Sequence, residues 1–125
     1  MPQVSISIDV PNLTQATDFY CNALNCSKIR DQGSMTILSN GSVEIYLLER
    51  AEGSKPYANA KYLRTFDRHW APIHLDFSVD DVNEAAKLVS KFGGLIEGSE
   101  SDDWGSIAYC VDPFGHGFCL IKENS

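Results

Sequence analysis

The sequence has no long apolar run and no segment that would mark export. A membrane-spanning helix needs roughly 20 consecutive apolar residues, and no stretch of the chain approaches that length. The opening residues Met1-Pro2-Gln3 carry no basic side chain and lead directly into alternating apolar and polar residues. We therefore expect a cytoplasmic protein without a membrane partner.

Basic residues are scarce. Ten Lys and Arg residues stand against seventeen Asp and Glu residues, which gives a net charge of -7, and no basic cluster is present. Because this charge repels a phosphate backbone over most of the surface, we expect no nucleic-acid partner. The acidic balance is compatible with a neutral or cationic small molecule.

The cysteines lack the spacing of a disulfide framework or a zinc ribbon. None of the four stands in a CxxC pair, and two lie beside apolar residues in predicted strands or helices. This usage is typical of reduced thiols in a cytosolic protein. The four are Cys21, Cys26, Cys110 and Cys119.

An internal repeat is present. Residues 4–10 match residues 73–79 in their alternation of apolar and polar side chains, which predicts two strands with one buried face each. Asn12 and Asp81 then stand where a helix N-cap is wanted. Apolar residues at spacings of three and four predict helices over residues 13–24 and 82–92.

Three short extended runs follow each predicted helix. We expect them at residues 27–32, 34–39 and 43–50, and again at 95–100, 106–111 and 117–122. The chain of 125 residues is thus predicted to be one domain, 1–125, with module one at about 3–50, a connector at 51–69 and module two at about 70–123. The fold class is α+β, with two tandem βαβββ modules forming curved mixed sheets around a shared trough. The connector is expected to form a short helix between Tyr57 and Asp67.

The order of these motifs resembles a known family. A first helix containing Phe19-Tyr20, a repeat beginning Ile73-His74-Leu75, and a closing turn Asp112-Pro113-Phe114-Gly115-His116-Gly117 are together similar to the vicinal-oxygen-chelate superfamily. That family includes glyoxalase I, extradiol dioxygenases and bleomycin-resistance proteins. The resemblance implies a homodimer with the trough completed by pairing modules, and metal ligands on the first and fourth strands of each module.

Alternation along the strands selects the residues that face the trough. Side chains of one parity pack under the helices, and those of the other parity point into the trough. In module one these trough residues are Ser5, Ser7, Asp9, Glu44, Tyr46 and Leu48, and in module two they are His74, Asp76, Ser78, Cys119 and Ile121. Trp70 and Trp104 are expected near the rim.

The resemblance implies that the four ligand positions are Ser5, Glu44, His74 and Cys119. A serine hydroxyl is a poor metal ligand at neutral pH, and Cys119 stands where glyoxalase-like enzymes usually have a glutamate. One interpretation is a zinc site of Glu44, His74 and Cys119; the other is a binding pocket that has lost its metal. The extradiol chemistry lacks its second histidine, since His69 and His116 lie in the connector and a turn.

We expect a protein that binds or sequesters a neutral or cationic organic molecule and needs no cofactor. The predicted ligand-binding residues are Ser5, Ser7, Asp9, Tyr46, Leu48, Asp76, Trp104 and Ile121. The alternative is a metal-dependent lyase or isomerase, in which Glu44 or Asp76 takes a proton next to a carbonyl. A third hypothesis is a protein-interaction module that uses the aromatic connector.

Three residues also have purely structural interpretations. His74 could be a strand histidine that is hydrogen-bonded to Asp76, Glu44 an exposed edge carboxylate, and Cys119 a small core residue.

Overall fold

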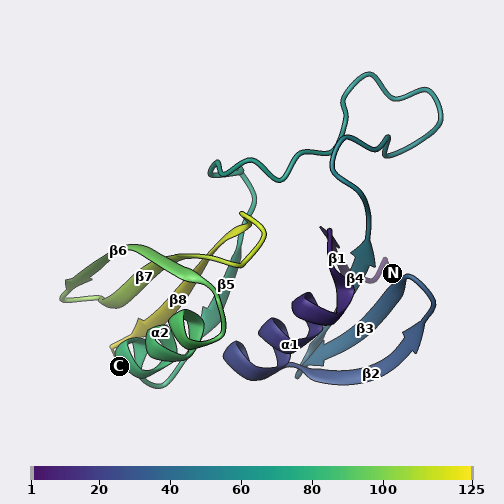
Figure 1. Cartoon of the computed structure of the whole chain (residues 1–125). Coiled ribbons are helices and arrows are strands. Elements are labelled where there is room, and N and C mark those ends of the chain that lie inside the picture. The colour runs from purple at the N-terminus through teal and green to yellow at the C-terminus, as the bar shows by residue number, and fades with distance from the viewer. Residues whose placement is uncertain (1, 125) are drawn as a thin grey trace.

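The computed structural model describes residues 2–124 and contains two consecutive βαβββ modules (Figure 1). Module one is built of β1 (Ile6–Val10), α1 (Leu13–Ala23), β2 (Ser27–Gln32), β3 (Met35–Asn40) and β4 (Val43–Glu49). Module two is built of β5 (Leu75–Ser78), α2 (Val82–Lys91), β6 (Leu95–Asp102), β7 (Gly105–Val111) and β8 (Gly117–Glu123). The α+β class and the two-module organisation predicted from the repeat are therefore confirmed.

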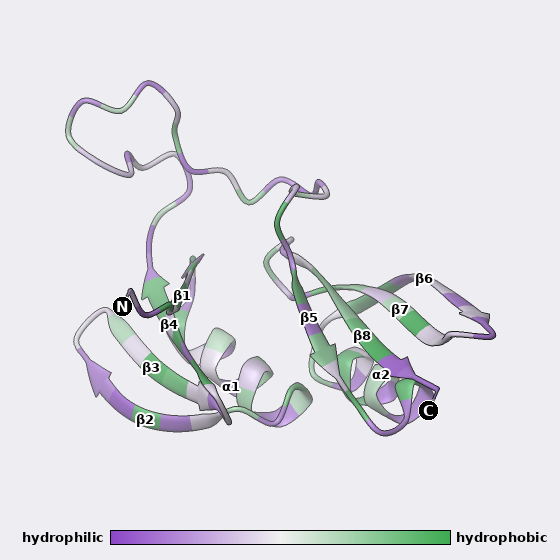
Figure 2. Ribbon diagram, turned by 180° about the vertical axis from the view of Figure 1, so that it is seen from behind, coloured by the Kyte–Doolittle hydropathy of each residue, from purple (hydrophilic) through white to green (hydrophobic). Residues whose placement is uncertain are grey.

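Each module forms a four-stranded mixed sheet of the same topology. The strand orders are β1-β4-β3-β2 and β5-β8-β7-β6, so the first strand of each module lies at one edge. It pairs in parallel with the last strand of its module, and the other pairs are antiparallel. The outer strand β2 is exposed along its whole length and is largely hydrophilic (Figure 2), which is typical of an edge strand that avoids further pairing.

Both helices begin where the caps were expected. The Asn12 side chain accepts a hydrogen bond from the Gln15 amide at 2.9 Å, and Asp81 accepts one from the Glu84 amide at 3.1 Å. Each cap satisfies an amide that has no partner within the helix and contributes about 1 kcal/mol.

One hydrophobic core joins the two modules. The helices lie between the two sheets and contact each other, and the Phe19 ring of α1 meets the Phe118 ring of β8 at 6.2 Å in an edge-to-face arrangement (Figure 1). A polar contact adds to this packing, because the Tyr20 hydroxyl donates to the buried carboxylate of Asp112 at 2.7 Å. Module one is thus fixed to the closing turn of module two.

Asp112 organises that closing turn. Its carboxylate also accepts the backbone amides of Phe114 and His116, each at 2.9 Å, and contacts His116 Nδ1 at 2.7 Å. Gly115 has a positive φ of 97°, and a Cβ atom there would lie 2.5 Å from the Phe66 carbonyl oxygen. The turn therefore needs glycine where the connector crosses it.

Two sequence predictions for the middle of the chain are wrong. No helix forms between Tyr57 and Asp67, because the Arg64 backbone instead exchanges hydrogen bonds with Gly53 and Ser54 across a loop. The strand predicted over residues 73–79 begins only at Leu75, and the Ile73 side chain, which alternation would bury under α2, is 86% exposed.

No helix among residues 2–124 has the length and apolar character needed to cross a bilayer.

Candidate functional site

The strand register of module two places three ionisable side chains in one row across β5, β8 and β7. Asp76 lies opposite Cys119, and Cys119 lies opposite Tyr109. Neighbouring residues Phe77, Phe118 and Leu120 belong to the core under α2, so the row points from the other face of the sheet. We call this face of module two the trough face.

His74 joins this row from the end of the connector. Its Nδ1 atom lies 3.0 Å from the Asp76 carboxylate and 4.0 Å from the Cys119 sulfur. Among residues 2–124 these three side chains form a group whose potential metal-binding atoms all lie within 4.8 Å of one another. Imidazole nitrogen, carboxylate oxygen and thiolate sulfur are all ligands of zinc, so the donor set fits Zn²⁺ in type.

The Cys119 thiol is neutral at physiological pH. Its burial, together with the negative charge of Asp76 and a hydrogen bond to it, raises its pKa to about 11. Such a thiol is a weak nucleophile and would have to lose its proton to bind a metal.

Aromatic and charged side chains form a wall beside this group. The Trp70 ring meets the His74 ring at 5.8 Å and the Tyr109 ring at 6.1 Å, both edge to face. The Arg68 guanidinium lies 4.7 Å from the centre of the Trp70 ring and forms an ion pair with Glu97 at 2.6 Å. That pair lowers the pKa of the Glu97 carboxyl.

Carboxylates outnumber cations on this part of the surface. Arg68 neutralises Glu97, but the described partners of Asp76 are His74 and the neutral Cys119 thiol, and Glu100 accepts a hydrogen bond from the Tyr109 hydroxyl at 3.2 Å. The trough face of module two is therefore aromatic and negatively charged.

The predicted residues of module one lie on a different sheet. Glu44 is exposed, accepts a hydrogen bond from the Tyr46 hydroxyl at 3.2 Å, and does not belong to the group around His74. Leu48 is half-buried on the same strand, and Ser5 is exposed just before β1. Within one chain, Asp76 rather than Glu44 is the carboxylate near His74 and Cys119.

A cavity of about 330 Å³ brings the two modules together at the edges of β1 and β5. Ser7 and Asp9 line it from module one and His74 lines it from module two, and residues of the other parity such as Ile6 and Leu75 line it as well. Arg64 also lines this cavity and donates to the Asp9 carboxylate at 2.7 Å. Trp104 and Ile121 lie outside it, on the β6–β7 turn and on β8.

Several of these residues were not predicted from the sequence. Tyr109 could have been found, because alternation along its predicted strand places it on the same face as Ile107. Arg64 and Arg68 lie in a connector without periodicity, and their carboxylate partners are distant in sequence. No local pattern could have identified them.

A family model described as a glyoxalase-like domain matches residues 5–121, which is nearly the whole chain. The chain belongs to the glyoxalase-like domain family. The motif order had indicated a resemblance to the vicinal-oxygen-chelate superfamily, and this assignment confirms it. A search of curated proteins gave no match.

Solved structures of this fold include antibiotic-resistance proteins and a lyase. The fosfomycin resistance protein FosX from Listeria monocytogenes has a TM-score of 0.74 at 17% identity, with 99% of this chain and 94% of that chain covered. Lactoylglutathione lyase from Agrobacterium tumefaciens has a TM-score of 0.64 at 19% identity, with 97% and 94% covered. A variant of the Listeria protein was solved with Mn(II) and 1S,2S-dihydroxypropylphosphonic acid, and has a TM-score of 0.73 at 18% identity, with 96% and 88% covered. At these identities the likeness shows the fold.

Proposed function

We propose that this glyoxalase-like protein binds a cationic or neutral organic molecule on the trough face of module two. The observation that carries the proposal is the aromatic wall of Trp70 and Tyr109 beside the carboxylates of Asp76 and Glu100. An aromatic face and a nearby carboxylate together favour a planar or amine-bearing cation.

The proposed assembly is a cytoplasmic homodimer in which the whole chain acts as one domain. Strands β1 and β5 are edge strands, each paired on one side only. Pairing with a second copy would bring the module one residues Glu44, Tyr46 and Leu48 over the trough face of module two. In that arrangement Ser5, Ser7, Asp9, Trp104 and Ile121 would line the outer part of the same site.

Thermal-shift measurements with charged aromatic probes test this function. We expect bleomycin or benzamidinium to stabilise the protein and benzoate to have no effect, since a ligand at 100 times its Kd adds about 2.7 kcal/mol to the stability. Asp76→Asn removes the central charge and should weaken cation binding about tenfold, whereas Asp103→Asn in the exposed β6–β7 turn should not. Equal binding by both variants would refute the assignment of the site.

A metal-dependent lyase or isomerase is a second candidate, favoured by the group of His74, Asp76 and Cys119. These residues would hold a divalent metal such as Zn²⁺, which supplies Lewis-acid polarisation of a substrate carbonyl when bound. Glu44, whose carboxylate is oriented by the Tyr46 hydroxyl, would take the proton next to that carbonyl.

Metal analysis of the purified protein separates the two candidates. Stoichiometric zinc, nickel or manganese that is lost in His74→Ala and in Cys119→Ala would establish the metal site. If Glu44→Ala also loses the metal, Glu44 is a ligand, as the resemblance implied, and not the base. If the protein takes up no metal from a solution of zinc, the binding function is the one candidate of the two that remains.

A further inference from the structure

The trough face of module two already holds one planar cation, the guanidinium of Arg68. Its Nε and Nη2 atoms donate to the two carboxylate oxygens of Glu97 at 2.7 and 2.6 Å, which is a forked contact. The same guanidinium lies 4.7 Å from the centre of the Trp70 ring. A forked carboxylate contact and an aromatic face are the interactions that a guanidinium prefers. We call Glu97 and Trp70 the guanidinium subsite.

A β-bulge brings the Glu97 carboxylate to this subsite. The register of β6 and β7 shifts between Ile96 and Gly98, so Glu97 is the extra residue of the bulge. A bulge changes the direction of a side chain while the strands on either side of it stay paired. The carboxylate of Glu97 thus reaches the Trp70 indole, whose Nε1 atom donates to it at 3.1 Å.

The Trp70 ring has contacts that do not depend on Arg68. It meets the rings of His74 and Tyr109 edge to face. It also lies directly against the backbone of β8, because a Cβ atom on Gly117 would come within 2.8 Å of the ring. The ring therefore keeps its place when the Arg68 guanidinium leaves.

The Arg68 side chain is held weakly, on a connector segment without helix or strand. Its side chain is 27% exposed and that of Glu97 is 33% exposed. Ion pairs at the surface contribute little to stability, because water screens the charges and the two side chains lose conformational freedom. The other described acceptors of the guanidinium are the backbone carbonyls of His69 and Gly115, the second at 3.5 Å. A cation from solution can therefore compete with Arg68.

We propose that Arg68 is a built-in occupant of the ligand site and that the ligand is a guanidinium or amidinium compound, which displaces it. The incoming cation takes the forked contact with Glu97 and the face of Trp70, and the Arg68 side chain turns out into solvent. One cation replaces another, so the charge within the guanidinium subsite stays the same. This inference rests on the proposed function, and it narrows the ligand class to cations with a forked pair of N–H donors.

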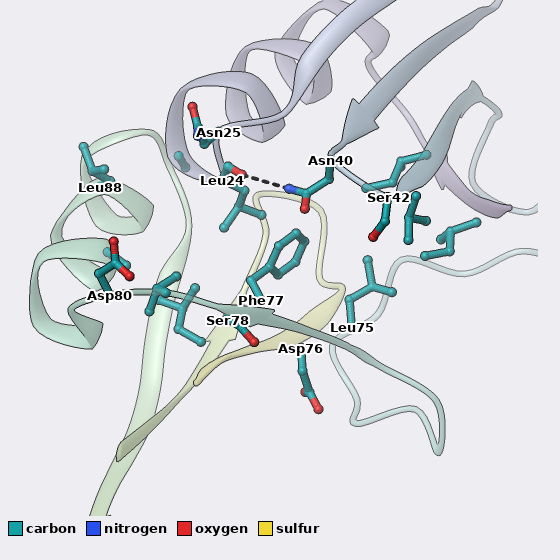
Figure 3. Close-up of a pocket in the computed structure, with 17 residues that line it drawn as sticks. Leu24, Asn25, Asn40, Ser42, Leu75, Asp76, Phe77, Ser78, Asp80 and Leu88 are labelled. Atoms are coloured by element: carbon teal, nitrogen blue, oxygen red, sulfur yellow. Dashed lines mark hydrogen bonds between the residues drawn. The ribbon is translucent and has the colours of Figure 1, made fainter. Parts of the chain in front are cut away.

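The rest of such a ligand extends from the guanidinium subsite toward Asp76. The His74 ring lies next to Trp70, and its Nδ1 atom is 3.0 Å from the Asp76 carboxylate. Asp76 and Phe77 point to opposite sides of β5 (Figure 3), and Phe77 belongs to the core, so Asp76 is on the trough face. Contacts with Asp76 offset the high effective concentration of the tethered Arg68 side chain.

Calorimetric titrations with two matched cations test the displacement. Benzamidinium and benzylammonium each carry one positive charge on a benzene ring, but only the amidinium offers a forked pair of donors, so it should bind at least about threefold more tightly. Arg68→Ala should tighten benzamidinium binding about three- to tenfold, because an occupied site lowers the apparent affinity by the fraction of molecules in which it is open. Arg68→Lys lacks the fork and should lie between. Adding Glu97→Gln to Arg68→Ala should weaken binding about tenfold.

The direction of the Arg68→Ala effect separates displacement from a structural role. A side chain that only positions Trp70 would weaken the site when removed, so weaker or unchanged binding overturns the proposal. Arg30→Ala is the matched control, because Arg30 is exposed on β2 and its removal changes the net charge equally. Equal tightening in this control, or equal binding of the two cations, also overturns it. The Arg68 and Glu97 side chains are partly exposed, so the variants should fold, which circular dichroism checks.

Asp76→Asn keeps this proposal separate from the proposed function. If Arg68→Ala does not tighten benzamidinium binding but Asp76→Asn still weakens it, only the displacement fails. If neither cation binds to the wild type or to Arg68→Ala, the proposed function fails and the displacement fails with it.

Discussion

The hydrogen bond between Tyr20 and Asp112 gives the sharpest prediction about the fold, because it joins the two modules. Tyr20 lies on α1 and Asp112 on the closing turn of module two, and both are buried. Burial, followed by the charge of Asp112 and the hydrogen bond to it, raises the pKa of the Tyr20 hydroxyl well above its usual range. The hydroxyl thus remains a donor to a carboxylate at all ordinary pH values.

Tyr20→Phe removes this donor and leaves the ring in place. Hydrogen bonds to charged groups contribute about 1.5 to 3 kcal/mol, so the free energy of unfolding should fall by that amount. With a urea slope of about 1.5 kcal/mol per molar for a chain of this size, the midpoint should fall by about 1 to 2 M. The loss remains partial because the Asp112 carboxylate keeps His116 and two backbone amides as donors.

Tyr109→Phe provides the matched control. The same atom is removed, but the Tyr109 hydroxyl bonds to Glu100 in an exposed position, where the expected cost is less than about 0.5 kcal/mol. Urea unfolding followed by tryptophan fluorescence compares the two variants at one protein concentration. If both midpoints agree within error, the buried contact between the modules does not contribute as we argue.

Three further predictions concern thiols and a glycine. In the folded protein a disulfide reagent should react first at the half-buried Cys21 and reach the three buried cysteines only after unfolding; rapid reaction of all four would contradict their burial. Burial raises the pKa of the Cys110 thiol from 9.0 to about 12, so above pH 9 this thiol loses its proton in the unfolded chain but keeps it in the folded one. Its contribution to the free energy of unfolding is therefore complete below pH 9 and falls by about 1.4 kcal/mol per pH unit above it. Thermal unfolding between pH 8 and 11 measures this slope, which Cys110→Ala should reduce. Gly115→Ala should lower the free energy of unfolding by considerably more than about 1 kcal/mol, because the added Cβ would meet the Phe66 carbonyl. Gly41→Ala has open space around it and should cost only about 1 kcal/mol of backbone strain. Similar losses in the two variants would refute the steric explanation.

Most of the fold could be predicted from the sequence. The repeat and its period of two identify the strands, and Asn12 and Asp81 mark the beginnings of both helices within one residue. These features are local, because a cap or an alternating strand depends on residues a few positions apart. The burial along β4 and β5 follows the same alternation, whereas Phe118, Cys119 and Leu120 of β8 are all buried.

The composition of the site depended on tertiary structure. Alternation shows which face a side chain occupies but not how two sheets lie relative to each other. It therefore could not show that Glu44 lies outside the group around His74, or that Asp76 lies beside Cys119. The connector was predicted least well, since its conformation is set by ion pairs such as Arg68 with Glu97, 29 residues apart. Contacts of that range have no period in the sequence, and only the folded chain brings their partners together.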